Sequence, residues 1–267
     1  MLERLSLDGK TIVITGGGTG LGREMALTMA RAGADLAIAS RRAGPIEEVA
    51  GLVRDMGRRS LAVATDVTDS DQVDCLFKAS LDEFGKVDVL VNNAGIVRGQ
   101  GGIPIWDVTD DDWRIGIDTN LTGSFYCSRA ISRHMAERGG GKIVNVASGF
   151  GLRGGRDNYM YACGKGGIVQ LTRTLATSLG RYGISSNCIV PGFIPTAGTD
   201  ASRENLPRGE FIPIGRVGRP VEIGPVAVFL ASAASDYMNG EMLVADGGGL
   251  AGGFAPTGYA PDIPLEV

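Results

Sequence analysis

Short runs of apolar residues alternate along the chain with longer stretches in which apolar positions recur every three or four residues. The short runs are rich in Val, Ile and Ala, which is typical of strands buried on both faces of a parallel sheet. The longer stretches have the period of amphipathic helices. The pattern predicts seven strands, at residues 11–15, 35–40, 60–65, 87–92, 141–147, 185–190 and 242–245.

Five helical stretches separate these strands, at residues 21–32, 44–56, 70–84, 110–138 and 158–182. Alternating strands and helices form right-handed crossovers, which wind into a parallel sheet with helices on both faces. We therefore expect a single α/β domain over residues 1–250, built on a doubly wound parallel sheet. The longest loop, residues 192–213, is a candidate lid. Residues 251–267 are rich in Gly and Pro and are predicted to form a tail without regular helix.

Composition narrows the possible partners. The net charge of −4 provides no basic field that would attract nucleic acid. The longest apolar stretches, such as residues 225–234, are too short to span a bilayer, and the first residues carry charge on both sides of Leu2, unlike a signal peptide. These features favour a cytoplasmic protein that acts on a small molecule, with neither nucleic acid nor membrane as a partner.

The histidine and cysteine content disfavours several kinds of site. The four cysteines form no Cys-x-x-Cys pair, which is typical of reduced thiols in the cytosol. The only histidine, His134, lies just before a glycine stop, where a helix is predicted to end. A Ser-His-Asp triad or a His-rich metal site would have to use that one residue. We therefore expect no metal centre.

A glycine-rich turn follows the first predicted strand and opens the first predicted helix. Gly16, Gly20 and Gly22 would let the backbone approach a pyrophosphate, and the N–H groups and dipole of the helix would bind its charge. The spacing differs from the G-x-G-x-x-G fingerprint, and no Lys-Ser/Thr of a Walker loop follows. A simple tight turn is the alternative interpretation.

Tyr161 and Lys165 are the strongest candidates for chemistry. Four residues apart on a predicted helix, they share one face, and an ammonium group beside a phenol favours phenolate and lowers the tyrosine pKa. A half-buried tyrosine beside a solvated lysine is the structural alternative. Ser148 follows the fifth strand, at the edge where open α/β sheets bind ligands, so its hydroxyl could polarise a substrate oxygen. It could equally be an ordinary turn residue.

These motifs together resemble the short-chain dehydrogenase/reductase family in its compact branch of about 250 residues. Thr15-Gly16-x-x-x-Gly20-x-Gly22 is similar to the family's cofactor loop, and Asn92-Asn93-Ala94-Gly95 to its structural motif after the fourth strand. Pro191-Gly192 and Asp246-Gly247-Gly248 look like its later markers. The resemblance extends from about residue 5 to 250. It implies a Rossmann-like fold and a catalytic tetrad of Asn120, Ser148, Tyr161 and Lys165.

The resemblance also implies a reaction. We expect an NAD(P)-dependent oxidoreductase, a short-chain alcohol dehydrogenase or ketone reductase acting on CH–OH groups, with Tyr161 as general acid/base in hydride transfer. Lys165 would lower the tyrosine pKa and bind the nicotinamide ribose. Asn120 would hold a water that links Lys165 to solvent. Its residue type alone is also compatible with a surface position or with a break between two helices.

The cofactor residues implied by the resemblance are Gly16, Thr19, Gly20, Leu21, Gly22, Ser40, Arg41, Asp66, Val67, Asn92, Ala94, Gly95, Tyr161, Lys165, Pro191, Gly192, Ile194 and Thr196. Asp66 and Val67 would contact the adenine. The second strand ends in Ser40-Arg41 rather than in a carboxylate, which favours the 2′-phosphate of NADP(H). The glycine loop lacks the basic residue that many NADP-binding members carry, so NAD(H) stays possible.

The substrate is expected to lie among Trp106, Phe150, Arg153, Arg156, Asn158 and Phe193. We hypothesise that Arg153 or Arg156 meets an anionic substrate group, with two surface arginines as the alternative. A polyol, an oxo-acyl thioester and a cyclic ketone all remain open. The family commonly forms dimers or tetramers through the two long helices, so the resemblance implies a homo-oligomer, either a dimer or a homotetramer. A non-catalytic dinucleotide sensor and an NAD-dependent sugar epimerase or dehydratase are the competing functions.

Overall fold

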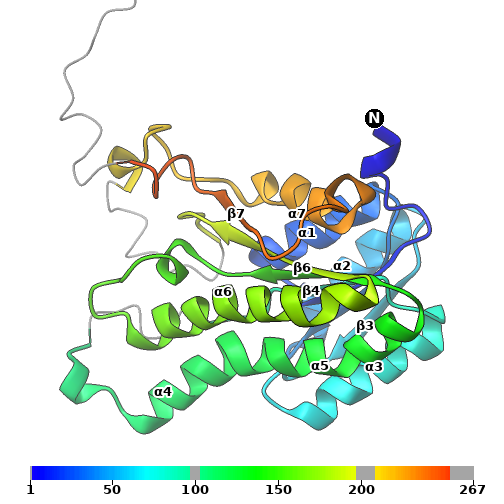
Figure 1. Ribbon diagram of the computed structural model, residues 1–267, viewed down its shortest axis with the longest axis horizontal. Helices are drawn as coiled ribbons and strands as arrows, with labels where there is room; N and C mark the ends of the chain where they lie inside the picture. Colours follow the sequence, from blue (N-terminus) through cyan, green and yellow to red (C-terminus); the bar gives the residue numbers. More distant parts are fainter. Residues whose placement is uncertain (1, 97–102, 197–207, 253–267) are drawn as a thin grey trace, which may run out of the picture.

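The computed structural model describes residues 2–96, 103–196 and 208–252 (Figure 1). Seven strands form one sheet in the order β3-β2-β1-β4-β5-β6-β7, and every neighbouring pair is parallel. This confirms the predicted doubly wound parallel sheet. The strands are β1 (Thr11–Thr15), β2 (Asp35–Ser40), β3 (Ser60–Ala64), β4 (Val89–Asn92), β5 (Gly141–Val146), β6 (Ile184–Pro191) and β7 (Met242–Ala245).

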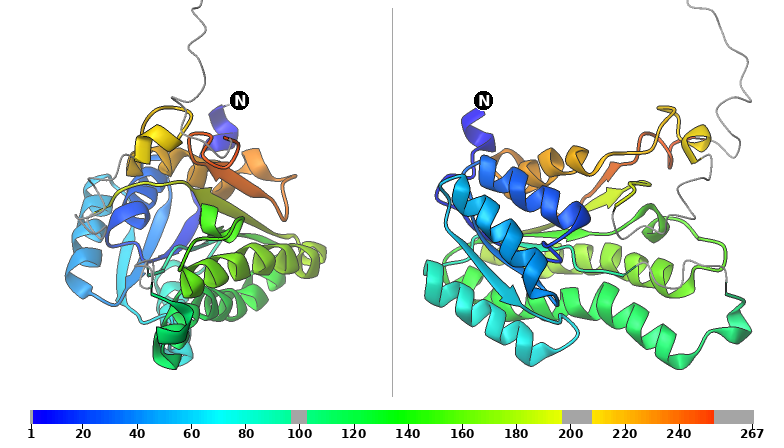
Figure 2. Two further views of the ribbon diagram at one scale, coloured as in Figure 1. Left: turned by 90° about the vertical axis from the view of Figure 1, so that its left-hand side faces the viewer. Right: turned by 180° about the vertical axis from the view of Figure 1, so that it is seen from behind.

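Helices cover both faces of the sheet (Figure 2). Successive side chains of a strand point to opposite faces. Ile12 and Ile14 accordingly pack in one core with the helices α1 (Gly20–Arg31), α2 (Ala43–Asp55) and α7 (Gly224–Ala231). Val13 packs in the opposite core with α3 (Ser70–Phe84) and α5 (Gly123–Glu137). On that side α5 also borders α6 (Tyr159–Leu179), and α6 in turn borders α4 (Asp110–Ile117).

The structure differs from the predicted helices in two places. The helix expected over residues 110–138 is divided into α4 and α5 by a wider π turn at Asp118–Thr122, where the N–H of Gly123 bonds the carbonyl of Asp118 five residues back. Helix α7 was not predicted at all. Its sequence is apolar at nearly every position because most of its residues are buried, so no amphipathic period marks it.

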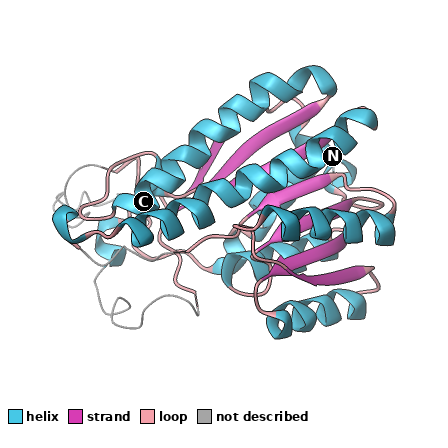
Figure 3. Cartoon of the chain, turned by 90° about the horizontal axis from the view of Figure 1, so that it is seen from below, coloured by secondary structure: helices cyan, strands magenta, loops and turns pink. Residues whose placement is uncertain are grey.

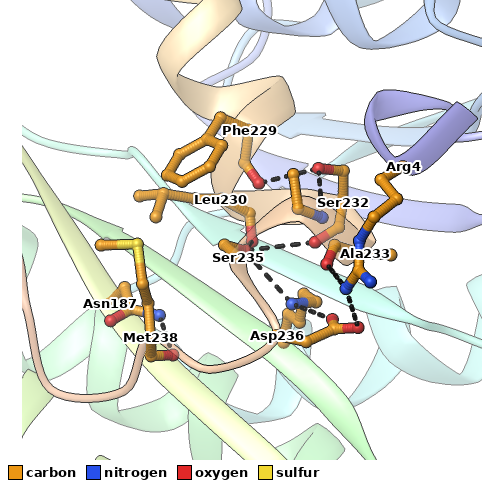
Figure 4. A network of polar contacts seen from close by, with 11 residues as sticks. Arg4, Asn187, Phe229, Leu230, Ser232, Ala233, Ser235, Asp236 and Met238 are labelled. Atoms are coloured by element: carbon orange, nitrogen blue, oxygen red, sulfur yellow. Dashed lines mark hydrogen bonds and ion pairs between the residues drawn. The ribbon is translucent and has the colours of Figure 1, made fainter. Parts of the chain in front are cut away.

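A polar network fastens the connection between α7 and β7 (Figure 4). The buried Ser235 hydroxyl bonds the carbonyls of Leu230 and Ser232, at 2.9 and 3.1 Å. The Asp236 carboxylate pairs with Lys142 of β5 and with Arg4 of the N-terminal 3₁₀ helix (Leu2–Leu5). These contacts fix the segment that precedes β7 and thereby help to position β7 itself.

The carboxyl ends of all seven strands lie at one edge of the sheet, since the strands are parallel (Figure 3). The strand order reverses between β1 and β4. Open α/β sheets bind ligands at such a switch point, where connections leave in opposite directions. Within the described ranges, no helix is long and apolar enough to cross a bilayer.

Candidate active site

The glycine-rich turn between β1 and α1 is folded too tightly for side chains. Gly16 has a φ of +65°, and a Cβ there would lie 2.9 Å from the Cα of Ala94. A Cβ on Gly22 would lie 2.2 Å from the carbonyl oxygen of Gly16. The α1 cap residue, Thr19, makes no side-chain cap bond, and the first turn of α1 holds no acidic residue. The positive end of α1 is thus open to an anion.

Thr15 and Asn93 hold this turn against the end of β4, a role that the sequence interpretation missed. The Asn93 amide donates to the carbonyls of Thr15 and Gly16, at 3.0 and 3.1 Å. The Thr15 hydroxyl accepts from the N–H groups of Asn93 and Ala94, both at 3.1 Å. Thr15 belongs to the glycine-rich motif and Asn93 to the Asn92-Asn93-Ala94-Gly95 motif. Their positions in these two motifs are the sequence signal for this contact.

Asn92, predicted as a cofactor residue, points into the protein. Its buried amide donates to Asn145 Oδ1 at 2.9 Å, and Asn145 donates in turn to the Thr172 hydroxyl at 2.9 Å. The same Asn92 amide also reaches Ser128 of α5. Its side chain therefore joins the sheet to α5 and α6. Asn145 and Thr172 went unnoticed in the sequence, although a polar residue within the apolar strand β5 was a usable signal.

The ends of β2 and β3 carry the residues predicted for the adenosine end of a cofactor. Arg41 and Arg42 are exposed, and α2 begins directly after them without a side-chain cap. The Ser40 hydroxyl donates to the Arg42 carbonyl at 3.2 Å. Asp66 accepts from the N–H and hydroxyl of Thr68. Val67 is buried and lies against Gly123, so its side chain contributes to packing.

Lys165 is buried, with only 5% of its surface exposed. Its ammonium group donates to the Val146 carbonyl at the end of β5, at 2.8 Å, and lies 5.8 Å from the centre of the Tyr161 ring. Burial disfavours the charged form and lowers the pKa of Lys165 to about 8. The stacked pair predicted from the spacing is present, but its lysine is not solvated.

The sequence predicts a lowered pKa for Tyr161, and this direction is wrong for the chain without cofactor. Burial raises the pKa of Tyr161, and a hydrogen bond with Ser148 acts in the opposite direction. Ser148 caps a short 3₁₀ turn, Gly149–Gly151, where its hydroxyl also accepts from the N–H of Phe150. The Phe150 ring meets Tyr161 edge-on, with 6.5 Å between ring centres. Desolvation thus outweighs the effect of Ser148 on the pKa of Tyr161.

Asn120 lies in the π turn that joins α4 to α5 and is fully buried, which excludes a surface position. Its Oδ1 accepts from the N–H of Ile96, and its amide donates to the carbonyls of Ile96 and Gly116. Both amide hydrogens of Asn120 are bonded to carbonyls, so a water held by Asn120 would have to donate to its side-chain or backbone carbonyl oxygen. The role in water binding stays a prediction.

Glycines let α6 approach the π turn. A Cβ on Gly164 would lie 2.9 Å from the Cβ of Asn120, and one on Gly167 would lie 2.5 Å from Leu121. A Cβ on Gly95 would lie 2.8 Å from Asn120 Oδ1 and 3.3 Å from the Lys165 ammonium. The end of β4, the π turn and α6 therefore meet around Lys165.

The loop after β6 reaches the glycine-rich turn. A Cβ on Gly20 would lie 3.2 Å from Thr196. Gly192, Phe193 and Ile194 line a cavity of about 290 Å³ beside the end of β7. Pro191 itself is buried within β6. The candidate lid falls partly outside the described residues, at 197–207, as do residues 97–102 and most of the predicted tail.

The two candidate substrate arginines differ in their surroundings. The Arg153 guanidinium lies 5.9 Å from the centre of the Phe150 ring, which touches Tyr161. The Arg156 side chain is 97% exposed and pairs loosely with Asp157, at 3.6 Å. Trp106 is 82% exposed on a short 3₁₀ turn and is farther into solvent than Phe150 or Phe193. Arg153 is therefore the better placed of the two arginines.

Comparisons with known proteins agree with this geometry. A family model described as Enoyl-(Acyl carrier protein) reductase matches residues 16–249. The chain is 37% identical to 2-dehydro-3-deoxy-D-gluconate 5-dehydrogenase of Escherichia coli, over 94% of this chain and 99% of the relative. It resembles the structure of a short-chain type dehydrogenase/reductase from Mycobacterium marinum with a TM-score of 0.87 at 36% identity, covering 93% and 98% of the two chains. The chain belongs to the short-chain dehydrogenase/reductase family.

A second solved structure is similar to the same extent. It is a gluconate 5-dehydrogenase from Burkholderia cenocepacia in complex with NADP and tartrate, with a TM-score of 0.87, 36% identity, and 94% and 99% of the two chains covered. As a short-chain dehydrogenase/reductase, the chain is an oxidoreductase that acts on CH–OH groups with NAD(P) as acceptor. The sensor and the sugar epimerase or dehydratase are therefore set aside.

Lys165 should make the stability of this dehydrogenase rise with pH between about 8 and 10.5. In that range the unfolded chain holds a proton on Lys165, whose ordinary pKa is 10.5, and the folded chain does not. The contribution is complete above 10.5 and is lost as pH falls towards 8. The free energy of unfolding is measured in urea for wild type and for Lys165→Met at several pH values in this range. The difference between the two isolates the contribution of Lys165 from that of the other titrating groups. A flat or falling difference would contradict the assignment.

Proposed function

We propose that this enzyme uses NADP(H) to interconvert a ketone and a secondary alcohol on a small hydroxy or oxo acid, with Tyr161 as general acid/base. The observation that carries the proposal is one cluster at the end of β5. The Lys165 ammonium lies 5.8 Å from the centre of the Tyr161 ring, and Ser148 acts to lower the pKa of Tyr161. A phenol, a hydroxyl and a buried cation beside the switch point of the sheet suit proton exchange with a carbonyl oxygen.

The residues present fit a dinucleotide cofactor. The glycine-rich turn leaves the N-terminus of α1 uncapped, and a Cβ on Gly20 would crowd Thr196 across the turn. Backbone N–H groups without side-chain partners at a helix N-terminus suit a pyrophosphate. When bound, the nicotinamide would supply hydride to a carbonyl carbon or accept it from an alcohol carbon.

The side chains would handle the proton. In reduction, Tyr161 would donate its phenolic proton to the carbonyl oxygen while Ser148 donates a hydrogen bond to the same oxygen. In oxidation the phenolate would take the proton back. Lys165 in its ammonium form favours phenolate. Proton resupply through a water on the Asn120 carbonyl completes the proposed tetrad.

Tyr161→Phe should lower kcat by about 10²- to 10⁴-fold, the usual contribution of general acid–base catalysis. NADP(H) affinity, measured by fluorescence titration, should change little, because the ring remains. Tyr159→Phe is the matched control, because Tyr159 lies two residues before Tyr161 and its hydroxyl donates to Asp157. Loss of that hydroxyl should leave kcat nearly unchanged. Equal activity of the two variants would contradict the role of Tyr161.

The choice of NADP(H) is supported by charge at the end of β2. Arg41 and Arg42 form no ion pair within the described part of the chain, and they precede the uncapped start of α2. A guanidinium group and free backbone N–H groups together suit a 2′-phosphate. No carboxylate stands at the end of β2 to accept from a ribose 2′-hydroxyl.

Arg41→Asp should reverse the cofactor preference, because it removes a phosphate partner and adds an acceptor for the ribose hydroxyl. In the wild type, kcat/KM for NADPH divided by kcat/KM for NADH should exceed 1. In Arg41→Asp this ratio should fall by about 10- to 100-fold, the effect of losing a charge-assisted hydrogen bond of about 1.5–3 kcal/mol. Arg31→Asp, with the same charge change at the far end of α1, controls for net charge. An unchanged ratio would leave NAD(H) as the better assignment.

The acidic substrate class is supported by Arg153 and by the relatives. Gluconate and tartrate, which appear in the names of similar proteins, are hydroxy acids. Arg153 stacks on Phe150 next to Tyr161, so its guanidinium could bind a carboxylate while the substrate's CH–OH group faces the phenol.

Arg153→Ala should raise KM for a carboxylated substrate by about 10- to 100-fold and leave KM for its neutral polyol counterpart unchanged. Arg156→Ala is the matched control, since that side chain is exposed and pairs with Asp157. Steady-state kinetics with D-gluconate and D-glucitol would separate the two. Equal effects of both variants on both substrates would remove the carboxylate from the proposal.

We further propose a homo-oligomer, a dimer or tetramer, in the cytoplasm. Trp113, Ile115 and Phe125, which are 42%, 42% and 44% exposed on α4 and α5, support an interface along these helices. Apolar side chains gathered on one exposed region commonly mark an interface. Four free cysteines support a reducing compartment.

A further inference from the structure

Within the described residues, one buried acceptor at the start of α6, three residues before Tyr161, has no hydrogen-bond partner. Asn158 directly precedes α6 and is 4% exposed, and its Oδ1 makes no hydrogen bond. An asparagine in this cap position ordinarily uses Oδ1 to accept from the first N–H groups of the helix, but Asn158 makes no such bond. Buried acceptors are rarely left unpaired, so a missing partner calls for a physical explanation.

The backbone before Asn158 is strained. Asp157 has a φ of +52°, and no other non-glycine residue within the described ranges has a positive φ. Its carboxylate accepts from the Tyr159 hydroxyl at 3.2 Å. Asp tolerates this conformation better than most residues, but at a cost. Strain of this kind persists where the surroundings fix it, and it gathers at ligand-binding sites.

The unpaired amide lies in the same corner as the reacting group. A Cβ on Gly155 would lie 3.2 Å from the Cβ of Asn158 and 2.8 Å from the Phe150 ring. The Phe150 ring in turn meets Tyr161 edge-on. Phe150 therefore contacts Tyr161 and lies near Gly155, which in turn lies beside Asn158. The Arg153 guanidinium lies 5.9 Å from the centre of the same Phe150 ring. A strained turn and an unpaired acceptor both occur there.

We propose that Asn158 determines specificity by accepting a hydrogen bond from a second hydroxyl of the substrate, next to the CH–OH group that reacts. The ligand class is a polyhydroxy acid, and the inference rests on the proposed function. A site built to bond a hydroxyl discriminates strongly against analogues that lack it, because the buried acceptor is then left unpaired. Simple ketones and alcohols with one oxygen would leave Oδ1 without a partner.

The wild-type enzyme provides the first test. Its kcat/KM is measured for D-gluconate and for the mono-deoxy analogues of D-gluconate, with the reacting carbon identified from the product. Removal of one particular non-reacting hydroxyl should lower kcat/KM by about 10- to 100-fold, and removal of the others much less. If no single hydroxyl matters, the proposal is overturned whatever the variants do.

Variants then assign that hydroxyl to Asn158. Asn158→Leu, close in shape and without an acceptor, should abolish the preference for the hydroxylated substrate over the sensitive deoxy analogue. Its thermal midpoint should equal or exceed that of wild type, because an unpaired polar atom has been removed. Asn158→Asp keeps an oxygen acceptor and should retain the preference.

The outcomes separate the two proposals. No turnover of D-gluconate or its oxo derivatives in either direction would remove the proposed substrate class, and the inference with it. Turnover with a hydroxyl preference that survives Asn158→Leu would overturn the inference alone. A lowered thermal midpoint in Asn158→Leu, with equal losses for both substrates, would show a purely structural asparagine.

Discussion

The site depends on holding one ammonium group away from water. Lys165 is 5% exposed, and among the described residues its ammonium group donates one hydrogen bond, to the Val146 carbonyl at the end of β5. A buried cation is costly unless polar groups surround it, and burial lowers the pKa of Lys165 to about 8. Lys165 is therefore mostly protonated at neutral pH, but its pKa of about 8 lies only a little above that pH. Any loosening of the packing around it would change both its protonation and its influence on Tyr161.

Close helix packing provides that setting. Gly164 and Gly167 let α6 lie directly against the π turn, and the turn carries Asn120 into contact with the end of β4. π turns within helices often occur at functional sites, since the extra residue redirects the backbone. The same arrangement places Tyr161 between Lys165 on one side and Phe150 on the other. The chemistry thus follows from three elements that meet at one edge of the sheet.

Much of this was predictable from sequence, for identifiable reasons. Strands such as β1 and β4 are buried along their whole length and carry runs of Val, Ile and Leu, because both faces of the sheet are covered, and such runs can be recognised in the sequence. The four-residue spacing of Tyr161 and Lys165 likewise predicts their proximity on α6, which the structure has. Three features were not visible. The π turn does not interrupt the helical pattern of residues 110–138, and α7 lacks a polar face. The raised pKa of Tyr161 reflects burial, which spacing does not encode.

The central claim is that Tyr161 and Lys165 act as one proton-transfer unit. A double-mutant cycle on kcat tests it most directly, with Tyr161→Phe, Lys165→Met and the double variant measured under identical, cofactor-saturating conditions. Residues that act as a unit give strongly non-additive losses. The account predicts that the double variant loses about as much as the worse single variant. Losses that multiply would show two independent residues and would contradict it.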